Sequence, residues 1–165
     1  MIAGIGIDTV NLDRFAEHLQ RTPRLRERLF SPLELRSSGE PLGTGEPLGS
    51  GEPRGADGQS GDRDQETTDA GTVGLHPPQV KRGLRPEQLA ARFAAKEALI
   101  KALGGGVRGF RFADISVLND AHGAPRFELT GAIASHVQSR GLHLHVSLTH
   151  DAPVAQAFVV AETLG

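Results

Sequence analysis

Alternation of large and small side chains marks the predicted strands of this sequence. The first residues, IAGIGI, alternate isoleucine with glycine and alanine and predict a buried strand that Asp8 is expected to end. Polar and apolar residues alternate again near the C-terminus, and an Asn-Asp-Ala-His-Gly turn joins two earlier stretches into an antiparallel pair. The predicted strands cover residues 2–7, 112–118, 125–129, 143–149 and 154–161.

Apolar residues at helical spacing predict helices between these strands. The clearest one covers residues 86–103, where Pro86 suits the first turn, the interior is rich in Ala, and Gly104 to Gly106 end the helix. The mixture of strands and helices without a regular βαβ repeat predicts an α+β fold, with helices packed on an antiparallel sheet. Shorter helices are predicted after a cap at Asn11 or Asp13, over residues 24–29, after the start signal at Ser31-Pro32, and after a cap at Thr130.

A Gly- and Pro-rich stretch interrupts the pattern. Residues 37–85 hold 11 of the 21 Gly and 5 of the 10 Pro, with a Gly-Glu-Pro near-repeat at a period of six. Such a composition buries too little apolar surface to offset the entropy of ordering. We therefore expect a single domain over residues 1–165 with a flexible insert at about 37–80. A solenoid of six-residue turns is the alternative, for which three repeats are too few.

Composition excludes several classes of protein. The chain has 18 Lys+Arg and 20 Asp+Glu, a net charge of −2, which excludes a globally basic nucleic-acid binder. It has no Cys, which excludes disulfides, thiolate metal sites and a cysteine nucleophile. No apolar run approaches the roughly 18 residues of a membrane helix, and the N-terminus lacks the basic start of a signal peptide. These features predict a soluble, cytoplasmic protein.

Two carboxylates and one lysine are candidates for chemistry. Asp8 follows an apolar strand, and Glu97 interrupts the apolar side of the long helix, with Lys101 one turn further along. If the carboxylates converge, they form an oxygen-ligand pair suited to Mg²⁺, and Lys101 could hold phosphate oxygens. The alternatives are a turn or helix cap for Asp8 and a surface Glu–Lys pair on the helix.

Ser147, Thr149 and His150 lie at the end of the next-to-last predicted strand. Ser147 and Thr149 share a face, and His150 is expected just beyond the strand, where it could donate to a phosphate. A Ser–His–Asp hydrolase is an alternative, but these sequence neighbours lack a nucleophile-elbow pattern. A zinc site that includes His143 and His145 is another, although an exposed strand face explains both more simply.

Five arginines within fifteen residues form a local basic cluster: Arg14, Arg21, Arg24, Arg26 and Arg28. They form either a solvated helix face or a docking patch for an acidic partner. Few aromatic residues are interleaved with them, which makes single-stranded nucleic acid a poor candidate ligand.

Four motifs follow one another along the chain outside the insert: Gly4-Ile5-Gly6-Ile7-Asp8, Arg92-Phe93-Ala94-Ala95-Lys96-Glu97-Ala98, the Gly-rich turn with Asp114-Ile115, and Ser147-Leu148-Thr149-His150. Together these motifs resemble the holo-[acyl-carrier-protein] synthases, the small trimeric class of 4′-phosphopantetheinyl transferase. The resemblance implies the fold of that family and a magnesium-dependent transfer of 4′-phosphopantetheine from coenzyme A to a serine of apo acyl carrier protein. The second product is adenosine 3′,5′-bisphosphate, and the reaction supports the biosynthesis of fatty acids or of polyketides.

The resemblance also implies roles for single residues. Asp8 and Glu97 match the family's magnesium ligands, and Lys101 completes the implied catalytic set as a lysine that contacts coenzyme A phosphates. Either Glu97 or a water held by the metal is the base for the serine hydroxyl. The implied coenzyme A-binding residues are Arg92, Lys101, Gly104, Ser147, Thr149 and His150, and the implied carrier-docking residues are Arg14, Arg21, Arg24 and Arg28.

Active sites of this family lie between the subunits of a trimer, so the resemblance implies a homotrimer. The implied partners are coenzyme A and acyl carrier protein, and neither nucleic acid nor a membrane is expected.

Two other functions use the same residues. A metal-dependent phosphohydrolase would use the carboxylates without a carrier, and a non-catalytic module would use only the arginine cluster to bind an acidic partner.

Overall fold

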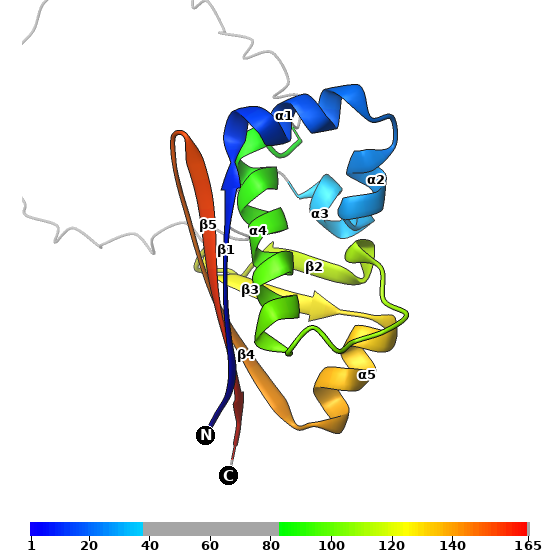
Figure 1. Cartoon of the computed structure of the whole chain (residues 1–165), viewed down its shortest axis with the longest axis vertical. Coiled ribbons are helices and arrows are strands. Elements are labelled where there is room, and N and C mark those ends of the chain that lie inside the picture. The colour runs from blue at the N-terminus through cyan, green and yellow to red at the C-terminus, as the bar shows by residue number, and fades with distance from the viewer. Residues whose placement is uncertain (38–82, 165) are drawn as a thin grey trace, which may run out of the picture. The chain divides into compact units, whose positions relative to one another are not determined.

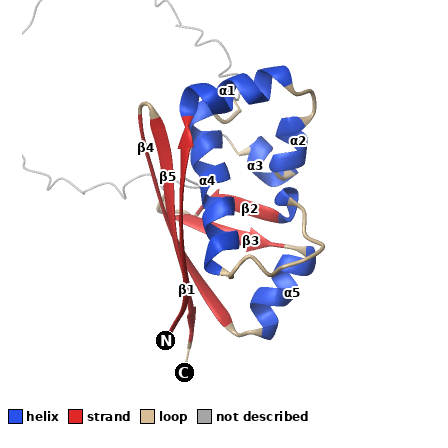
Figure 2. Ribbon diagram, viewed as in Figure 1, coloured by secondary structure: helices blue, strands red, loops and turns tan. Residues whose placement is uncertain are grey.

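The computed structural model describes residues 1–37 and 83–164, which form an α+β structure as predicted (Figures 1 and 2). The predicted insert lies outside the described residues, apart from Ser37, and stays a prediction. An antiparallel sheet has the order β1 (Ile2–Asn11), β5 (Val154–Thr163), β4 (Leu142–Asp151), and β2 (Ile115–Asn119) pairs with β3 (Pro125–Leu129). The helices are α1 (Leu12–Arg21), α2 (Leu25–Leu29), α3 (Pro32–Arg36), α4 (Pro86–Ala102), α5 (Gly131–Ser139) and the 3₁₀ helix η1 (Phe112–Asp114).

Strand β1 lies directly against the backbone of helix α4. A Cβ added to Gly6 would overlap the carbonyl oxygen of Ala98, and one added to Gly4 would overlap that of Ala102. Only glycine allows the two backbones to approach so closely. The small residues in the opening strand therefore serve helix packing, and α4 runs along the sheet in Figure 1.

The sheet buries one face and exposes the other. On β5, alanine and valine residues from Ala155 to Ala161 alternate toward α4 and are fully or almost fully buried. On the opposite face Ile5, Ile7 and Phe158 are 53%, 57% and 43% exposed. The exposed side chains are adjacent, because Ile7 pairs with Phe158 in the strand register. The described residues thus leave an apolar patch on the outer face of the sheet.

Several strands run further than the sequence predicted, and β1 and β4 extend through residues expected to lie beyond them. Asp8 lies inside β1, which continues to Asn11, and His150 lies inside β4, which continues to Asp151. The reason is pairing with β5: Asn11 and Asp151 both reach its first residue, Val154, so the ladder carries on through polar residues.

Helix starts were largely predicted, with two differences. The side chain of Asn11 accepts the Arg14 N–H at the start of α1, and Ser31 and Glu34 form a complete capping box at α3. Residues 112–114, predicted as strand, form η1 because the Asp114 carboxylate accepts the Arg111 N–H and closes a turn. The Thr130 side chain does not cap α5.

Helix α4 differs from a surface helix with one apolar stripe. Ten of its residues are buried, including Arg92 and Lys96. Lys96 and Glu34 form an ion pair of 2.8 Å in which neither side chain is exposed. The Lys96 ammonium also donates to the carbonyl oxygens of Leu29 and Phe112. The Lys96 ammonium therefore has three hydrogen-bond acceptors, as a buried charge requires.

Glu34 connects α3 to the rest of the core. Its Oε2 atom accepts the backbone N–H of Ser31, and its Oε1 atom accepts that of Val117 on β2. One carboxylate therefore links α3, α4 and β2. Since the pair is desolvated on both sides, removal of either charge leaves the other buried and unpaired.

We expect Lys96→Met to lower the free energy of unfolding by about 3–5 kcal/mol, because Glu34 would keep an uncompensated buried charge. Lys101→Met is the matched control on the same helix. Lys101 also forms an ion pair, but its side chain is 51% exposed, so its loss should cost at most about 1 kcal/mol. Urea denaturation measures both; equal losses would contradict the assigned role of burial.

Candidate active site

Asp8 points toward helix α4 from the middle of β1. It lies two residues after Gly6 and on the same face of the strand, the face whose backbone touches α4. The close contact of the two backbones thus places the carboxylate next to the last turns of the helix. Asp8 does not end the strand, because β1 continues past it to Asn11. The packing of β1 on α4 therefore sets the position of its carboxylate.

Glu97 and Lys101 meet Asp8 from α4. The Lys101 ammonium donates to Asp8 Oδ1 over 2.7 Å and to the carbonyl oxygen of Ile7 over 2.9 Å. Glu97 and Asp8 line the same pocket, which has a volume of about 260 Å³. The structure therefore brings together the three residues that the sequence singled out.

The environment of the pocket disfavours the charged form of Glu97. Partial burial raises the pKa of Glu97, and the negative charge of Asp8 raises it further, while Lys101 has a weaker opposing effect. Glu97 therefore gives up its proton less readily than an ordinary glutamate. A site of this kind attracts a cation, which would relieve the repulsion.

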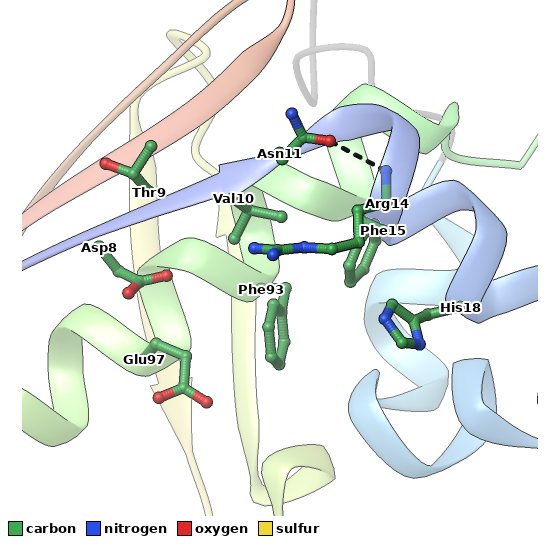
Figure 3. A pocket seen from close by; sticks show the side chains of 9 residues that line it. All are labelled: Asp8, Thr9, Val10, Asn11, Arg14, Phe15, His18, Phe93 and Glu97. Atoms are coloured by element: carbon green, nitrogen blue, oxygen red, sulfur yellow. Dashed lines mark hydrogen bonds between the residues drawn. The ribbon is translucent and has the colours of Figure 1, made fainter.

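Helix α1 forms the other side of the pocket (Figure 3). Arg14 and His18 line it from adjacent turns of α1, and the rings of Phe15 and Phe93 stack at 5.4 Å between their centroids. In Figure 3 the carboxylates lie at one end and His18 at the other, with the aromatic rings between. His18 and the two rings were not predicted as site residues, although His18 follows Arg14 by one turn in the sequence.

Arg92 and His150 line a second pocket, of about 270 Å³. Arg92 is almost buried, and its guanidinium donates to the carbonyl oxygens of Val117 and Gln88. Burial lowers the pKa of this guanidinium, and the carboxylate of Glu34 opposes that effect. Neither Arg92 nor His150 lines the pocket at Asp8.

The remaining predicted coenzyme A residues lie elsewhere. Ser147 and Thr149 line a hollow of about 120 Å³ on the outer face of the sheet, next to Ile7 and Phe158. Gly104 is exposed just beyond α4 with a φ of 79°, where it ends the helix as predicted. In a single chain the predicted binding residues are thus divided among several surfaces.

Two alternative sites are not assembled. Ser147 and His150 line different hollows, so they do not form a Ser–His–Asp hydrolase site. His143 and His145 are exposed on β4, and His145 pairs with Glu162 at 2.7 Å. Within residues 1–37 and 83–164 no group of three His, Asp or Glu side chains is arranged to hold a metal.

All four predicted docking arginines are exposed. Arg14 lines the pocket at Asp8, and Arg21 pairs with Glu17 at 3.6 Å on the same helix. Arg24 precedes α2 in the left-handed conformation, with a φ of 62°, and Arg28 is on α2 itself. The arginines therefore extend from the pocket along α1 and α2. No helix in the described part of the chain has the length and hydrophobicity to cross a bilayer.

Comparison with known proteins identifies related sequences and structures. Residues 71–159 match the 4′-phosphopantetheinyl transferase superfamily. A holo-[acyl-carrier-protein] synthase of Leifsonia xyli subsp. xyli is 39% identical over 163 residues, which cover 98% of each chain. The crystal structure of holo-[acyl-carrier-protein] synthase from Neisseria meningitidis matches with a TM-score of 0.67 and 27% identity over 99% of this chain and 100% of that one. An ACPS–CoA complex from Chronobacterium ammoniagenes matches with a TM-score of 0.62 and 26% identity over 98% of each chain.

We expect Glu97→Gln to raise the melting temperature at pH 7.5 by about 1–3 °C. Because folding raises the pKa of Glu97, the folded chain binds this proton more tightly than the unfolded chain. Ionisation therefore costs stability above the raised pKa, and the cost disappears below the unfolded value of about 4.3. The gain should vanish near pH 3.5, and Glu128→Gln, an exposed control on β3, should show no gain. A pH-independent gain would contradict the electrostatic cause.

Proposed function

Because this chain belongs to the holo-[acyl-carrier-protein] synthases of the 4′-phosphopantetheinyl transferase superfamily, we propose that the pocket at Asp8 and Glu97 is its catalytic centre. The enzyme transfers 4′-phosphopantetheine from coenzyme A to a serine of apo acyl carrier protein, and adenosine 3′,5′-bisphosphate leaves. The observation that carries the assignment is that Asp8 of β1 and Glu97 of α4 line one pocket. Lys101, one turn further along α4, donates a hydrogen bond to Asp8.

The donor set of the pocket fits Mg²⁺. Mg²⁺ in phosphate-handling sites uses one or two carboxylates and takes its other ligands from water and substrate phosphate. Asp8 and Glu97 are such a pair, and the effect of Asp8 on the pKa of Glu97 favours a cation between them. When bound, the ion would neutralise charge on the diphosphate as a Lewis acid.

The side chains of the chain supply the rest of the chemistry. Lys101 brings an ammonium group to the same place as Asp8, and this second positive charge stabilises the leaving bisphosphate. Glu97 is the carboxylate with the raised pKa, so it is the better group to receive the proton of the serine hydroxyl. Arg14, which lines the pocket from α1, and the exposed Arg21, Arg24 and Arg28 further along α1 and α2 form the surface that receives the acidic carrier protein.

The divided coenzyme A residues favour an active site shared between subunits. Arg92 and His150 lie in a pocket apart from Asp8, so one chain alone does not gather the set around the carboxylates. In a homotrimer, the Arg92 pocket of one subunit could face the Asp8 pocket of the next and bind the nucleotide end. The exposed patch of Ile5, Ile7 and Phe158 supplies apolar surface for such an association. The absence of Cys fits a cytoplasmic location.

The assignment predicts that Asp8→Asn, Glu97→Gln and Lys101→Met each lower kcat/KM by about 100- to 1000-fold, since each removes charge from the reacting groups. Mass spectrometry of apo acyl carrier protein incubated with coenzyme A and Mg²⁺ measures the added phosphopantetheine. Glu128→Gln, which changes an exposed carboxylate on β3, should retain full activity. Wild-type-like transfer by the Asp8 or Glu97 variant would remove that residue from the site.

The shared site predicts that Phe158→Arg yields a folded but inactive monomer. A charge on the outer face of the sheet would disrupt an apolar interface, and circular dichroism should show an unchanged fold. Leu33→Arg is the matched control, because Leu33 is similarly exposed, at 46%, but is on α3. Light scattering gives the mass of each variant. A Phe158→Arg protein with the wild-type mass and activity would argue against this interface.

A further inference from the structure

A groove between α2 and η1 has no role in the reaction described above. Its volume is about 620 Å³, more than twice that of the pocket at Asp8. Leu25, Leu29 and Phe112 provide apolar walls, and Arg28 and Arg111 line it with guanidinium groups. One carboxylate, that of Glu27, also lines the groove.

A row of aromatic rings connects this groove to the catalytic pocket. The Phe112 ring of the groove lies 5.7 Å from the Phe93 ring, measured between centroids. Phe93 in turn stacks on Phe15, and both of these rings line the pocket at Asp8. The two hollows share no lining residue, but this row of packed rings links their walls.

Arg111 is oriented for an external partner. Asp114 accepts two hydrogen bonds from its guanidinium, from Nε at 3.2 Å and Nη2 at 2.8 Å. The Arg111 side chain nevertheless remains 80% exposed, whereas that of Asp114 is 9% exposed. The arginine is thus held in place from its inner side while its outer side faces solvent, which reduces the entropy lost on binding an anion.

We propose that the groove between α2 and η1 is a second contact for the carrier protein. An apolar side chain of an acidic helix of the carrier enters between Leu25 and Phe112, and neighbouring carboxylates pair with Arg28 and Arg111. This extends the docking surface from α1 across α2 to η1 and makes Arg111 a specificity-determining residue for the carrier. The inference rests on the function proposed above.

The charges of the groove favour a carrier helix over the pantetheine arm of coenzyme A. The arm beyond its phosphates is uncharged, so the two guanidinium groups would add little to its binding. An acidic amphipathic helix uses both features, since its apolar residues fill the groove and its carboxylates meet the arginines. Arg28 also joins the groove to the docking arginines of α1 and α2, so the surface is continuous.

Steady-state kinetics with purified apo acyl carrier protein as the varied substrate tests the proposal. We expect Arg111→Ala to raise the KM for the carrier about two- to five-fold at low salt, the range of an exposed charge pair. The increase should shrink at high salt because exposed charges are screened. The kcat and the KM for coenzyme A should stay unchanged, and Arg111→Lys, which keeps the charge, should recover part of the loss.

Two further variants keep the test decisive. Leu25→Asp places a negative charge in the groove and should raise the KM for the carrier even if Arg111→Ala disturbs η1. Arg126→Ala is the matched control, because Arg126 is an exposed arginine paired with Glu128 on β3, away from the groove. It should leave the KM for the carrier unchanged, and thermal melts should confirm that every variant is folded.

The outcomes separate the two levels of inference. If wild-type protein transfers no phosphopantetheine, the proposed function fails. If it is active but Arg111→Ala and Leu25→Asp match Arg126→Ala, the groove does not contact the carrier and the inference is overturned. A rise in the KM for coenzyme A alone would also overturn it, in favour of a groove that binds the pantetheine arm.

Discussion

The backbone contact between β1 and α4 is the constraint on which the proposed active site depends. Gly6 and Gly4 leave no side chain between strand and helix, and alanines on α4 present carbonyl oxygens directly to them. Asp8 and Glu97 belong to these two elements, so the separation of the carboxylates follows from main-chain packing. A methyl group at Gly6 would push β1 and α4 apart, and with them Asp8 and Glu97, without touching any substrate.

Around this contact the enzyme divides its tasks among different parts of the fold. The sheet and α4 hold the groups that we propose act on the diphosphate, whereas α1, α2 and η1 carry exposed arginines on a less buried part of the chain. Phe93 on α4 and Phe112 on η1 bridge the two parts through their rings. The proposed catalytic end therefore carries two carboxylates and a lysine, while the proposed docking end is apolar with exposed arginines at its edge.

Much of the structure followed from the sequence, and the failures have physical causes. The carboxylates at Asp8 and Glu97 were predicted because a charge in an apolar pattern is conspicuous. Lys96 was missed as a core residue: its partner, Glu34, is 62 residues away, and only tertiary structure shows that pairing. The ends of β1 and β4 were misjudged because pairing with β5 carries a strand through polar residues. The groove at Phe112 joins separate elements and leaves no local pattern.

The close contact at Gly6 also has a meaning for protein engineering. Gly6 and Ala98 are among the residues that set the distance between the carboxylates. They lie beneath the site, where they contact neither substrate. The residues that we propose face a partner, such as Arg14 and Arg111, are exposed and can be exchanged without disturbing that distance. A library that randomises the exposed partner-facing residues and keeps the packing residues fixed should yield variants that act on new carrier proteins. The transfer chemistry should be unchanged in these variants.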